Sequence, residues 1–215
     1  GAPDADSIGG SRLDGGQVHI IWGRSSWPSV IDLLTDPGTV VYGAKAGDGV
    51  GDHAIVAGDV TGDGRPELVV AAYRAKNQTG SKSIVGKLHV LFWRANWPAT
   101  IDLLTQSDVT IYGRSASDGL GITLALGDLE SDGTLDIIAG AGGGDGPLDG
   151  RDGAGQAYVF RGRTSWPSLI NLAATSADSV IYGFDAGDST FVGNGLAVGD
   201  LDADLRLELL TGARL

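Results

Sequence analysis

The chain has 215 residues and a formal net charge of −12, from 15 Lys and Arg against 27 Asp and Glu. This charge argues against nucleic acid or an anionic membrane as a partner, and no apolar run reaches the roughly 18 residues of a membrane span. The absence of Cys excludes a disulfide framework and thiol chemistry. Because the chain has no Met, we expect a processed product or a piece of a longer protein.

One long pattern repeats along the whole chain, at a nearly constant spacing that is marked by Trp27, Trp97 and Trp166. Each unit carries, in the same order, an apolar segment that begins with Gly, an Arg-x-x-Trp-Pro segment, a Tyr-Gly pair and an acidic stretch. The Gly-led segments are 16–22, 86–92 and 155–160, and the Tyr-Gly pairs are 42–43, 112–113 and 182–183.

The apolar segments of the first unit predict short strands and no helix of useful length. We expect strands near Val18–Trp22, Val40–Tyr42, Ala54–Ala57 and Glu67–Ala72. Many of these runs are apolar on both faces, which is typical of strands that lie between other sheets. Four antiparallel strands per unit predict an all-β fold made of β-propeller blades, with about three repeats. A solenoid or a β-sandwich accounts less well for so long a period with one acidic stretch in each unit.

The tryptophans that precede a Pro have two interpretations. They could form an aromatic platform for sugar rings, or they could anchor a long connection by packing; we favour packing, because the residue recurs in every unit. His19, His89 and Tyr158 share one repeat position and are expected to pack within strands. The Gly-rich segment 142–155 is expected to be an exposed loop, and a cation site at its three Asp residues is the alternative.

The acidic stretch at the end of each unit places oxygen side chains at positions 1, 3, 5 and 9 between two apolar runs. An ordinary turn needs only one or two such residues, whereas several carboxylates pressed together repel one another unless a cation is present. Ca²⁺ takes six to eight oxygen ligands, so the stretches predict about three Ca²⁺ sites. The candidate side chains are Asp59, Thr61, Asp63 and Glu67; Asp128, Glu130, Asp132 and Asp136; and Asp200, Asp202, Asp204 and Glu208.

Two features are expected to weaken particular sites. Thr61 leaves the first loop with three carboxylates. Leu205 stands where the other loops have Gly64 and Gly133, and a residue with a Cβ is strained if this position needs a positive φ. The third site is therefore expected to be the weakest of the three.

These residues resemble the FG-GAP repeats of integrin α-chain-type β-propellers, especially those of bacterial integrin-like repeat proteins of secreted and cell-surface origin. The Asp-x-Asp-x-Asp-Gly-x-x-Asp calcium loop of the family maps onto the three acidic stretches. The family's Gly-Ala-Pro element stands at Gly1-Ala2-Pro3 and is altered at 71–73, 140–142 and 212–214. Its Phe-Gly element is weakened to Val50-Gly51, Leu120-Gly121 and Val192-Gly193.

The resemblance implies that Ca²⁺ binds in the loop between the first two strands of each blade. It adds one backbone carbonyl to each set of ligands, at position 7 of the loop. The three residues that would supply it are Arg65, Thr134 and Arg206.

The resemblance also sets expectations for organisation. Residues 1–215 form one propeller segment, with repeats at about 1–70, 71–139 and 140–211, and 212–215 beginning the next. With these repeat boundaries, we expect the chain to hold the outer half of one blade, two whole blades and the inner half of another. Either it belongs to a larger propeller, or copies of it complete one another's split blades.

For function, the expectation is a non-enzymatic, calcium-stabilised adhesion or recognition module outside the cell or on its surface. Its partner would be a protein or glycan bound at a loop face, with no nucleic acid and no membrane insertion. The alternatives are an architectural subunit of a surface layer or filament, and an accessory propeller of a secreted hydrolase or lyase. No catalytic residue is predicted, because the chain lacks Cys and a Gly-x-Ser-x-Gly motif, and its three His residues are scattered.

Overall fold

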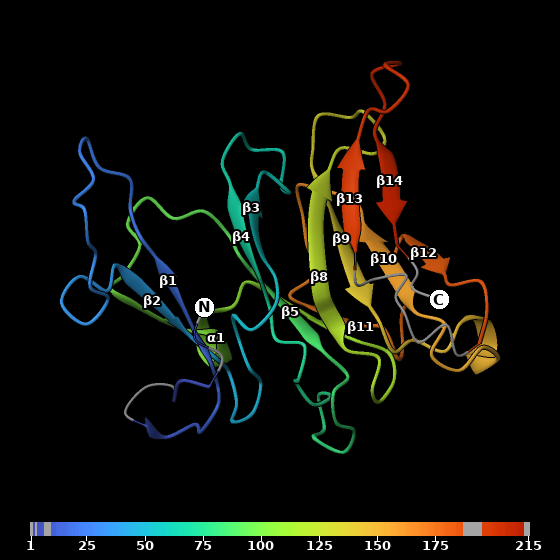
Figure 1. Cartoon of the computed structure of the whole chain (residues 1–215), viewed down its shortest axis with the longest axis horizontal. Helices are drawn as coiled ribbons and strands as arrows, with labels where there is room; N and C mark the ends of the chain where they lie inside the picture. Colours follow the sequence, from blue (N-terminus) through green and yellow to red (C-terminus); the bar gives the residue numbers. More distant parts are fainter. Residues whose placement is uncertain (1, 3, 7–9, 187–194, 213–215) are drawn as a thin grey trace.

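The apolar segments form short strands that assemble into four sheets. The computed structural model describes residues 2, 4–6, 10–186 and 195–212. Figure 1 shows the first three sheets following one another along the longest axis, with the fourth overlapping the third in this view. The altered motifs at Val192-Gly193 and in residues 213–214, together with Gly1 and Pro3, lie outside the described residues. The strands of the described residues form open sheets.

The two end sheets are smaller than the two central ones. Sheet 1 has the order β1-β2-β6, sheet 2 β11-β7-β5-β4-β3, sheet 3 β12-β10-β9-β8 and sheet 4 β13-β14. The strands of sheets 1 and 2 are β1 (Gln17–Ile20), β2 (Thr39–Tyr42), β6 (Thr100–Asp102), β3 (Ile55–Gly58), β4 (Glu67–Ala71), β5 (Lys87–Leu91), β7 (Val109–Tyr112) and β11 (Leu169–Asn171). Those of sheets 3 and 4 are β8 (Leu120–Gly127), β9 (Asp136–Ala141), β10 (Gln156–Phe160), β12 (Ser179–Tyr182), β13 (Leu196–Gly199) and β14 (Glu208–Thr211).

Sheets 2 and 3 each contain the four antiparallel strands that the sequence predicts for a blade. Their second strands pair with their third strands in matching registers, Val69 with Val90 in sheet 2 and Ile138 with Val159 in sheet 3. Sheet 1 contains the two outer strands of a blade and sheet 4 the two inner ones. The all-β fold of propeller blades is therefore confirmed.

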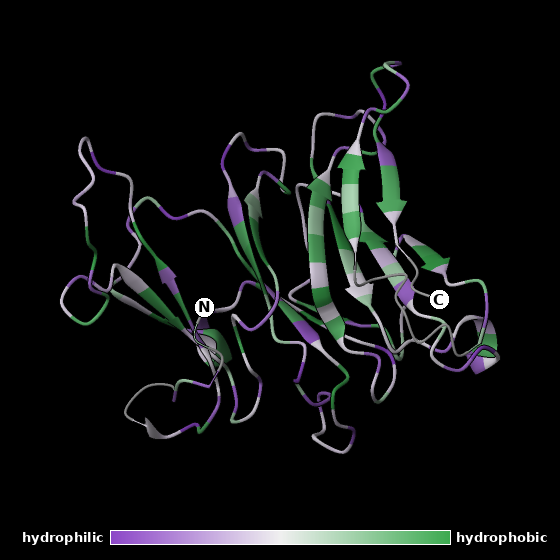
Figure 2. Ribbon diagram, in the orientation of Figure 1, coloured by the Kyte–Doolittle hydropathy of each residue, from purple (hydrophilic) through white to green (hydrophobic). Residues whose placement is uncertain are grey.

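The central strands are buried on both faces, as their composition predicts. On β4, Val69 packs in the core between sheets 2 and 3, whereas Val70 packs in the core between sheets 1 and 2. Both side chains are fully buried, and Figure 2 shows hydrophobic residues along most of the central strands. Burying a valine stabilises the fold by about 1.5–3 kcal/mol, so each sheet depends on its neighbours.

Two short edge strands and the short helices α1 and η2, all within residues 10–186, were not predicted. Strand β6 lies between β5 and β7 in the sequence, and β11 lies between β10 and β12. They pair in parallel with β2 and β7 of the preceding sheet, so each of these connections adds an edge strand to the preceding sheet. The helices are α1 (Leu103–Gln106), capped by the Asp102 side chain, and the 3₁₀ helix η2 (Pro147–Asp149) in the Gly-rich loop. Among the described residues, no helix has the length and apolar character needed to cross a membrane.

Most of the repeated aromatic residues pack as expected. Trp166 packs against the core between sheets 2 and 3, and Trp97 against the core between sheets 1 and 2. His89 and Tyr158 are buried within their strands. Trp27 is the exception at 59% exposed, because no described sheet precedes sheet 1 to cover it.

The Gly residue that leads the first two repeated segments allows neighbouring sheets to approach closely. Gly86 has φ +79°, and a Cβ at this position would lie 2.1 Å from the backbone N of Leu120. Gly16 has φ +82° and meets Val50 in the same way. No side chain fits at either position.

We therefore expect Gly86→Ala to lower the free energy of unfolding by at least about 2 kcal/mol, since the left-handed backbone alone costs an L-residue about 1–2 kcal/mol and the clash adds to it. The matched control is Gly80→Ala, at φ +78° in open space, which should cost only the backbone part. Urea unfolding measures both changes. Equal losses would contradict the close approach.

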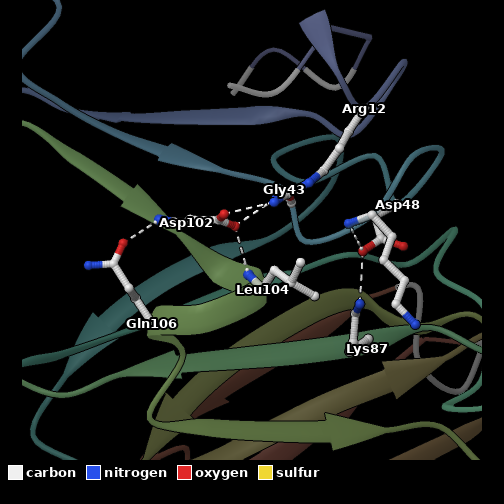
Figure 3. Close-up of polar contacts among 8 residues, drawn as sticks. Arg12, Gly43, Asp48, Lys87, Asp102, Leu104 and Gln106 are labelled. Carbon is white, nitrogen blue, oxygen red and sulfur yellow. Dashed lines mark hydrogen bonds and ion pairs between the residues drawn. The ribbon is translucent and has the colours of Figure 1, made fainter. Parts of the chain in front are cut away.

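Two ion pairs lie near the junction of sheets 1 and 2 (Figure 3). Arg12 donates to both carboxylate oxygens of Asp102, at 2.6 and 2.7 Å, and to the Gly43 carbonyl at 2.7 Å. Lys87 Nζ of β5 lies 2.8 Å from Asp48 Oδ2, and both side chains are buried. Burial lowers the pKa of Lys87, and the Asp48 carboxylate opposes this change.

The next blade has the same buried Asp without its ammonium partner. Asp118 occupies the position of Asp48 in the repeat, but Gln156 stands where Lys87 would be. In the described part of the chain, Asp118 Oδ1 has no hydrogen-bond partner, and Oδ2 accepts only from the Ser115 N–H at 3.0 Å. Burial raises the pKa of Asp118 to about 6.

Asp118 should make stability depend on pH. Because its pKa is higher in the folded than in the unfolded chain, the folded state holds the proton more tightly, and stability is lost as the pH rises from about 4 to about 6. We expect Asp118→Asn to be more stable than the wild type at pH 7.5, with an advantage about 1–3 kcal/mol larger than at pH 4. Asp152→Asn, at an exposed position, is the control for urea unfolding in EDTA. An advantage that does not change with pH would contradict this role of Asp118.

Candidate metal centres

The three acidic stretches form three hairpin loops with one shared geometry. Each connects the first and second strands of an inner hairpin, β3–β4, β8–β9 or β13–β14. Figure 1 shows the three loops at the same edge of the molecule, at the top of the view. Twelve of the fifteen predicted site residues lie in these loops, four in each, and the other three, Glu67, Asp136 and Glu208, are the first residues of β4, β9 and β14.

The Asp at position 1 organises each loop by accepting backbone N–H groups. Asp59 Oδ1 accepts from Gly62 at 2.7 Å, and its Oδ2 accepts from Gly64 at 2.7 Å. Asp128 accepts from positions 5 and 6 at 2.9 and 2.8 Å, and Asp200 does so at 3.1 and 3.0 Å. Hydrogen bonds of this kind fold the tip around a carboxylate.

Two further contacts repeat in every loop. The carboxylate at position 5 accepts from the N–H of position 7, at 2.9, 2.9 and 2.8 Å in the three loops. The carboxylate at position 9 accepts from the N–H of position 2, at 3.0, 3.0 and 2.6 Å. The backbone of each loop therefore holds the carboxylates of positions 1, 5 and 9 in place.

The backbone conformation explains where Gly is needed. Position 6 has a positive φ in all three loops, at Gly64, Gly133 and Leu205 (+72°). The expected strain at Leu205 is therefore present. Position 4 also has a positive φ, at Gly62, Ser131 and Ala203, which the sequence alone did not predict; the small side chains at this position are the signal that could have indicated it.

The carboxylates differ in how they are stabilised without a metal. Burial alone would raise the pKa of Asp59, but four backbone N–H groups outweigh it and hold this pKa below its usual value. Burial raises the pKa of Glu67. Burial and the neighbouring Asp136 carboxylate raise the pKa of Glu130, against the opposing charge of Arg161, which lies 2.5 Å away.

The third loop gathers its carboxylates most closely. Asp200, Asp202 and Glu208 each offer one oxygen within 4.8 Å of the other two, and no other group of three acids or imidazoles in the described residues does so. The sequence predicts that this site is the weakest of the three because of Leu205, and its affinity stays a prediction. No such group forms at Asp145, Asp149 and Asp152, and Asp145 instead accepts from the Gly153 N–H within its own loop.

The donor set fits a hard divalent cation. Every ligand offered is an oxygen, and the crowded carboxylates at Glu130 and Asp136 gain from a positive charge between them. The guanidinium of Arg65 does not enter the first loop; it lies over the Trp93 ring at 4.0 Å.

Comparisons with known proteins support the same class. The family model of the FG-GAP repeat matches residues 51–85 and 120–160, which include the first two loops. Integrin alpha-IIb of Mus musculus is 30% identical over 168 residues, which are 74% of this chain and 15% of that protein. Integrin alpha-IIb of Homo sapiens is 33% identical over 116 residues, 52% of this chain and 10% of that protein. Integrin alpha-PS2 of Drosophila melanogaster is 27% identical over 146 residues, 66% of this chain and 10% of that protein.

The fold and its acidic hairpins thus define a segment of a β-propeller. The chain is an integrin-like FG-GAP repeat protein, as the sequence predicts. It spans 10–15% of the length of these relatives.

The strain at Leu205 yields a test of the third loop. Leu205 is 87% exposed at φ +72°, so Leu205→Gly removes about 1–2 kcal/mol of backbone strain against about 0.5–1 kcal/mol from the freer unfolded chain. We expect hydrogen exchange in β13–β14 to slow by up to about tenfold. Arg206→Gly, next to it without a positive φ, should speed this exchange. Faster exchange in Leu205→Gly would show that the position is not strained.

Proposed function

We propose that this chain is a non-enzymatic, calcium-stabilised adhesion or recognition module that works outside the cell. The observation that carries the proposal is the threefold recurrence of one loop geometry, in which positions 1, 5 and 9 make the same backbone hydrogen bonds. Residues 1–215 act as one propeller segment with the repeats at about 1–70, 71–139 and 140–211.

Each loop would hold one Ca²⁺ through side-chain oxygens at positions 1, 3, 5 and 9 and a backbone carbonyl at position 7. The ion would supply positive charge where carboxylates crowd, and it would tie the tip to the base of the hairpin. Asp63 and Asp132 are central to the first two sites, since each already closes the turn by accepting the N–H of position 7. An ion that binds only the folded chain stabilises it by mass action.

The role in recognition rests on the relatives, whose names identify them as integrin α-chains. A propeller segment presents loops at the ends of its strands, and loops on a rigid scaffold commonly carry binding residues. We infer that a protein or glycan ligand binds at such a loop face. The acidic residues of the hairpins serve as cation ligands in this proposal, and no residue is assigned a catalytic role.

Calorimetric titration with Ca²⁺ tests the metal sites. We expect about three ions per wild-type chain, with Kd values of about 10⁻⁴–10⁻³ M as in other extracellular modules. The double variant Asp63→Ala and Asp132→Ala should bind only the ion of the third loop. Asp152→Ala, an exposed acid outside the loops, should leave the stoichiometry unchanged.

Removal of the metal gives the second readout. EDTA should lower the Tm of the wild type, and it should abolish binding to whichever spots on a glycan or matrix-protein array retain the chain in millimolar Ca²⁺. No heat of binding, or the same stoichiometry in the double variant, would contradict calcium binding in these loops. If EDTA leaves array binding unchanged, recognition does not depend on the metal.

A further inference from the structure

The turns that follow β2 and β7 each bury one aspartate in the same way. Asp48 and Asp118 stand six residues after the Tyr of their Tyr-Gly pairs, and both are 2% exposed. The Oδ2 atom of each accepts from the N–H group three residues earlier, Lys45 at 3.1 Å and Ser115 at 3.0 Å. The two carboxylates are therefore held by one repeated turn.

In the first of these sites an ammonium group neutralises the carboxylate. Lys87 Nζ lies 2.8 Å from Asp48 Oδ2 (Figure 3) and 5.6 Å from the centre of the Tyr112 ring. Lys87 of β5 pairs with Tyr112 of β7 in the sheet register. The counter-charge and the aromatic ring beside it thus come from two neighbouring strands.

The second site keeps this framework, but an amide replaces the ammonium. Gln156 of β10 pairs with Tyr182 of β12 in the same register. In the orientation that satisfies both ends of the amide, its carbonyl accepts from the N–H groups of Asp145 and Gly146 at 3.2 and 3.1 Å, and its NH₂ group donates to the Tyr158 hydroxyl. These bonds turn the amide to the Gly-rich loop, and none of them reaches the buried carboxylate.

Asp118 is left with an excess of negative charge around it. Among the described residues its Oδ1 atom is buried without a hydrogen-bond partner. Burial raises the pKa of Asp118 to about 6, against the Ser115 N–H; the charges of Asp145 and Asp149 add to the increase, and that of Arg114 opposes it. Arg114 is itself paired with Asp149 at 3.1 Å. Above this pKa the site holds a buried carboxylate with no cation of its own, which is costly.

A cavity lies beside the groups that interact with this carboxylate. Its volume is about 290 Å³, and Arg114, Tyr158 and Tyr182 are among its lining residues. The Asp118 charge acts on one of them, since burial and then this charge raise the pKa of Tyr158. Tyr182 holds the repeat position of the Tyr112 ring that lies beside the Lys87 ammonium. The surroundings of the carboxylate are therefore polar, aromatic and next to open space.

We propose that Asp118 binds a monovalent cation of about the size of an ammonium group, NH₄⁺ or K⁺, at the position that the Lys87 ammonium takes beside Asp48. Such an ion supplies the single positive charge that Lys87 supplies in the preceding blade. Ca²⁺ is a poorer match, because it prefers several carboxylates among six to eight oxygen ligands. The site is separate from the acidic hairpins and does not rest on the proposed function.

Urea unfolding in matched salts tests this site. The wild type is unfolded at pH 7.5 in KCl, NH₄Cl or choline chloride of equal ionic strength, which keeps the screening of surface charges the same. EDTA, added as its choline salt, keeps divalent ions from the hairpins. We expect the unfolding equilibrium constant to be about tenfold lower in KCl or NH₄Cl than in choline chloride when the small cation is at ten times its Kd. At pH 4 the difference should vanish, because Asp118 then holds a proton.

Two variants assign the effect to Asp118. Asp118→Asn should respond to the change of salt by less than about twofold at pH 7.5, whereas Asp152→Asn, at an exposed position, should respond like the wild type. Gln156→Lys places an ammonium at the repeat position of Lys87 and should also lose the response. If Gln156→Lys fails to fold, the comparison of Asp118→Asn with Asp152→Asn still decides the question.

The same measurements distinguish the two ions and can overturn the proposal. A larger effect of NH₄⁺ than of K⁺ supports a site that uses N–H donors, and the reverse order supports an ion held by oxygens alone. Equal wild-type stability in all three salts would mean that no small cation binds here. Equal responses of the wild type and Asp118→Asn would place the cation elsewhere on the chain. Either of these last two results overturns the proposal.

Discussion

Burial of each sheet on both faces is the constraint on which this structure depends. The inner strands β4 and β5 carry apolar side chains that divide between the cores on either side. A sheet of this kind is stable only between two others. The close approach at Gly86, the contact of Gly58 with two leucines and the bond from Trp166 to Val60 all follow from this requirement. The exposure of Leu201 and Leu210 follows from it as well, because in the part of the chain that the structure describes sheet 4 has a neighbour on only one side.

Each acidic hairpin connects two neighbouring strands through a tight loop. The position 1 carboxylate accepts the backbone N–H groups that the turn would otherwise leave unpaired, and the position 9 carboxylate joins the loop to the start of the second strand. This arrangement forms from the chain's own hydrogen bonds. It leaves several negative charges close together, most clearly at Asp200, Asp202 and Glu208. A divalent cation is the natural counter-charge for such a loop.

The sequence predicted much of the fold, because its strongest signals are local and repeated. Apolar runs such as Val40–Tyr42 indicate a strand without knowledge of its partner. The repeated spacing of Asp59, Asp128 and Asp200 indicates a common loop. The positive φ at Leu205 could be predicted because Gly occupies its position in the other two repeats.

What the sequence did not indicate depends on contacts between distant residues. Strand β11 forms because β7, which belongs to the preceding repeat, offers it an edge. The pairing of Lys87 with Asp48 joins β5 to the loop between β2 and β3, across a separation of 39 in the sequence. The buried Asp118 lacks such a partner because Gln156 replaces the lysine. The tightness of the third acidic cluster likewise reflects the side-chain positions in the folded loop.

A crystal structure determined in millimolar Ca²⁺, with anomalous differences recorded, tests whether the acidic hairpins bind calcium. We expect one anomalous peak in each hairpin tip, surrounded by oxygens of positions 1, 3, 5, 7 and 9 at about 2.3–2.6 Å. Tips that show no peak, while their backbone keeps the geometry seen here, would mean that the carboxylates shape the turn alone and that calcium has no part in this fold.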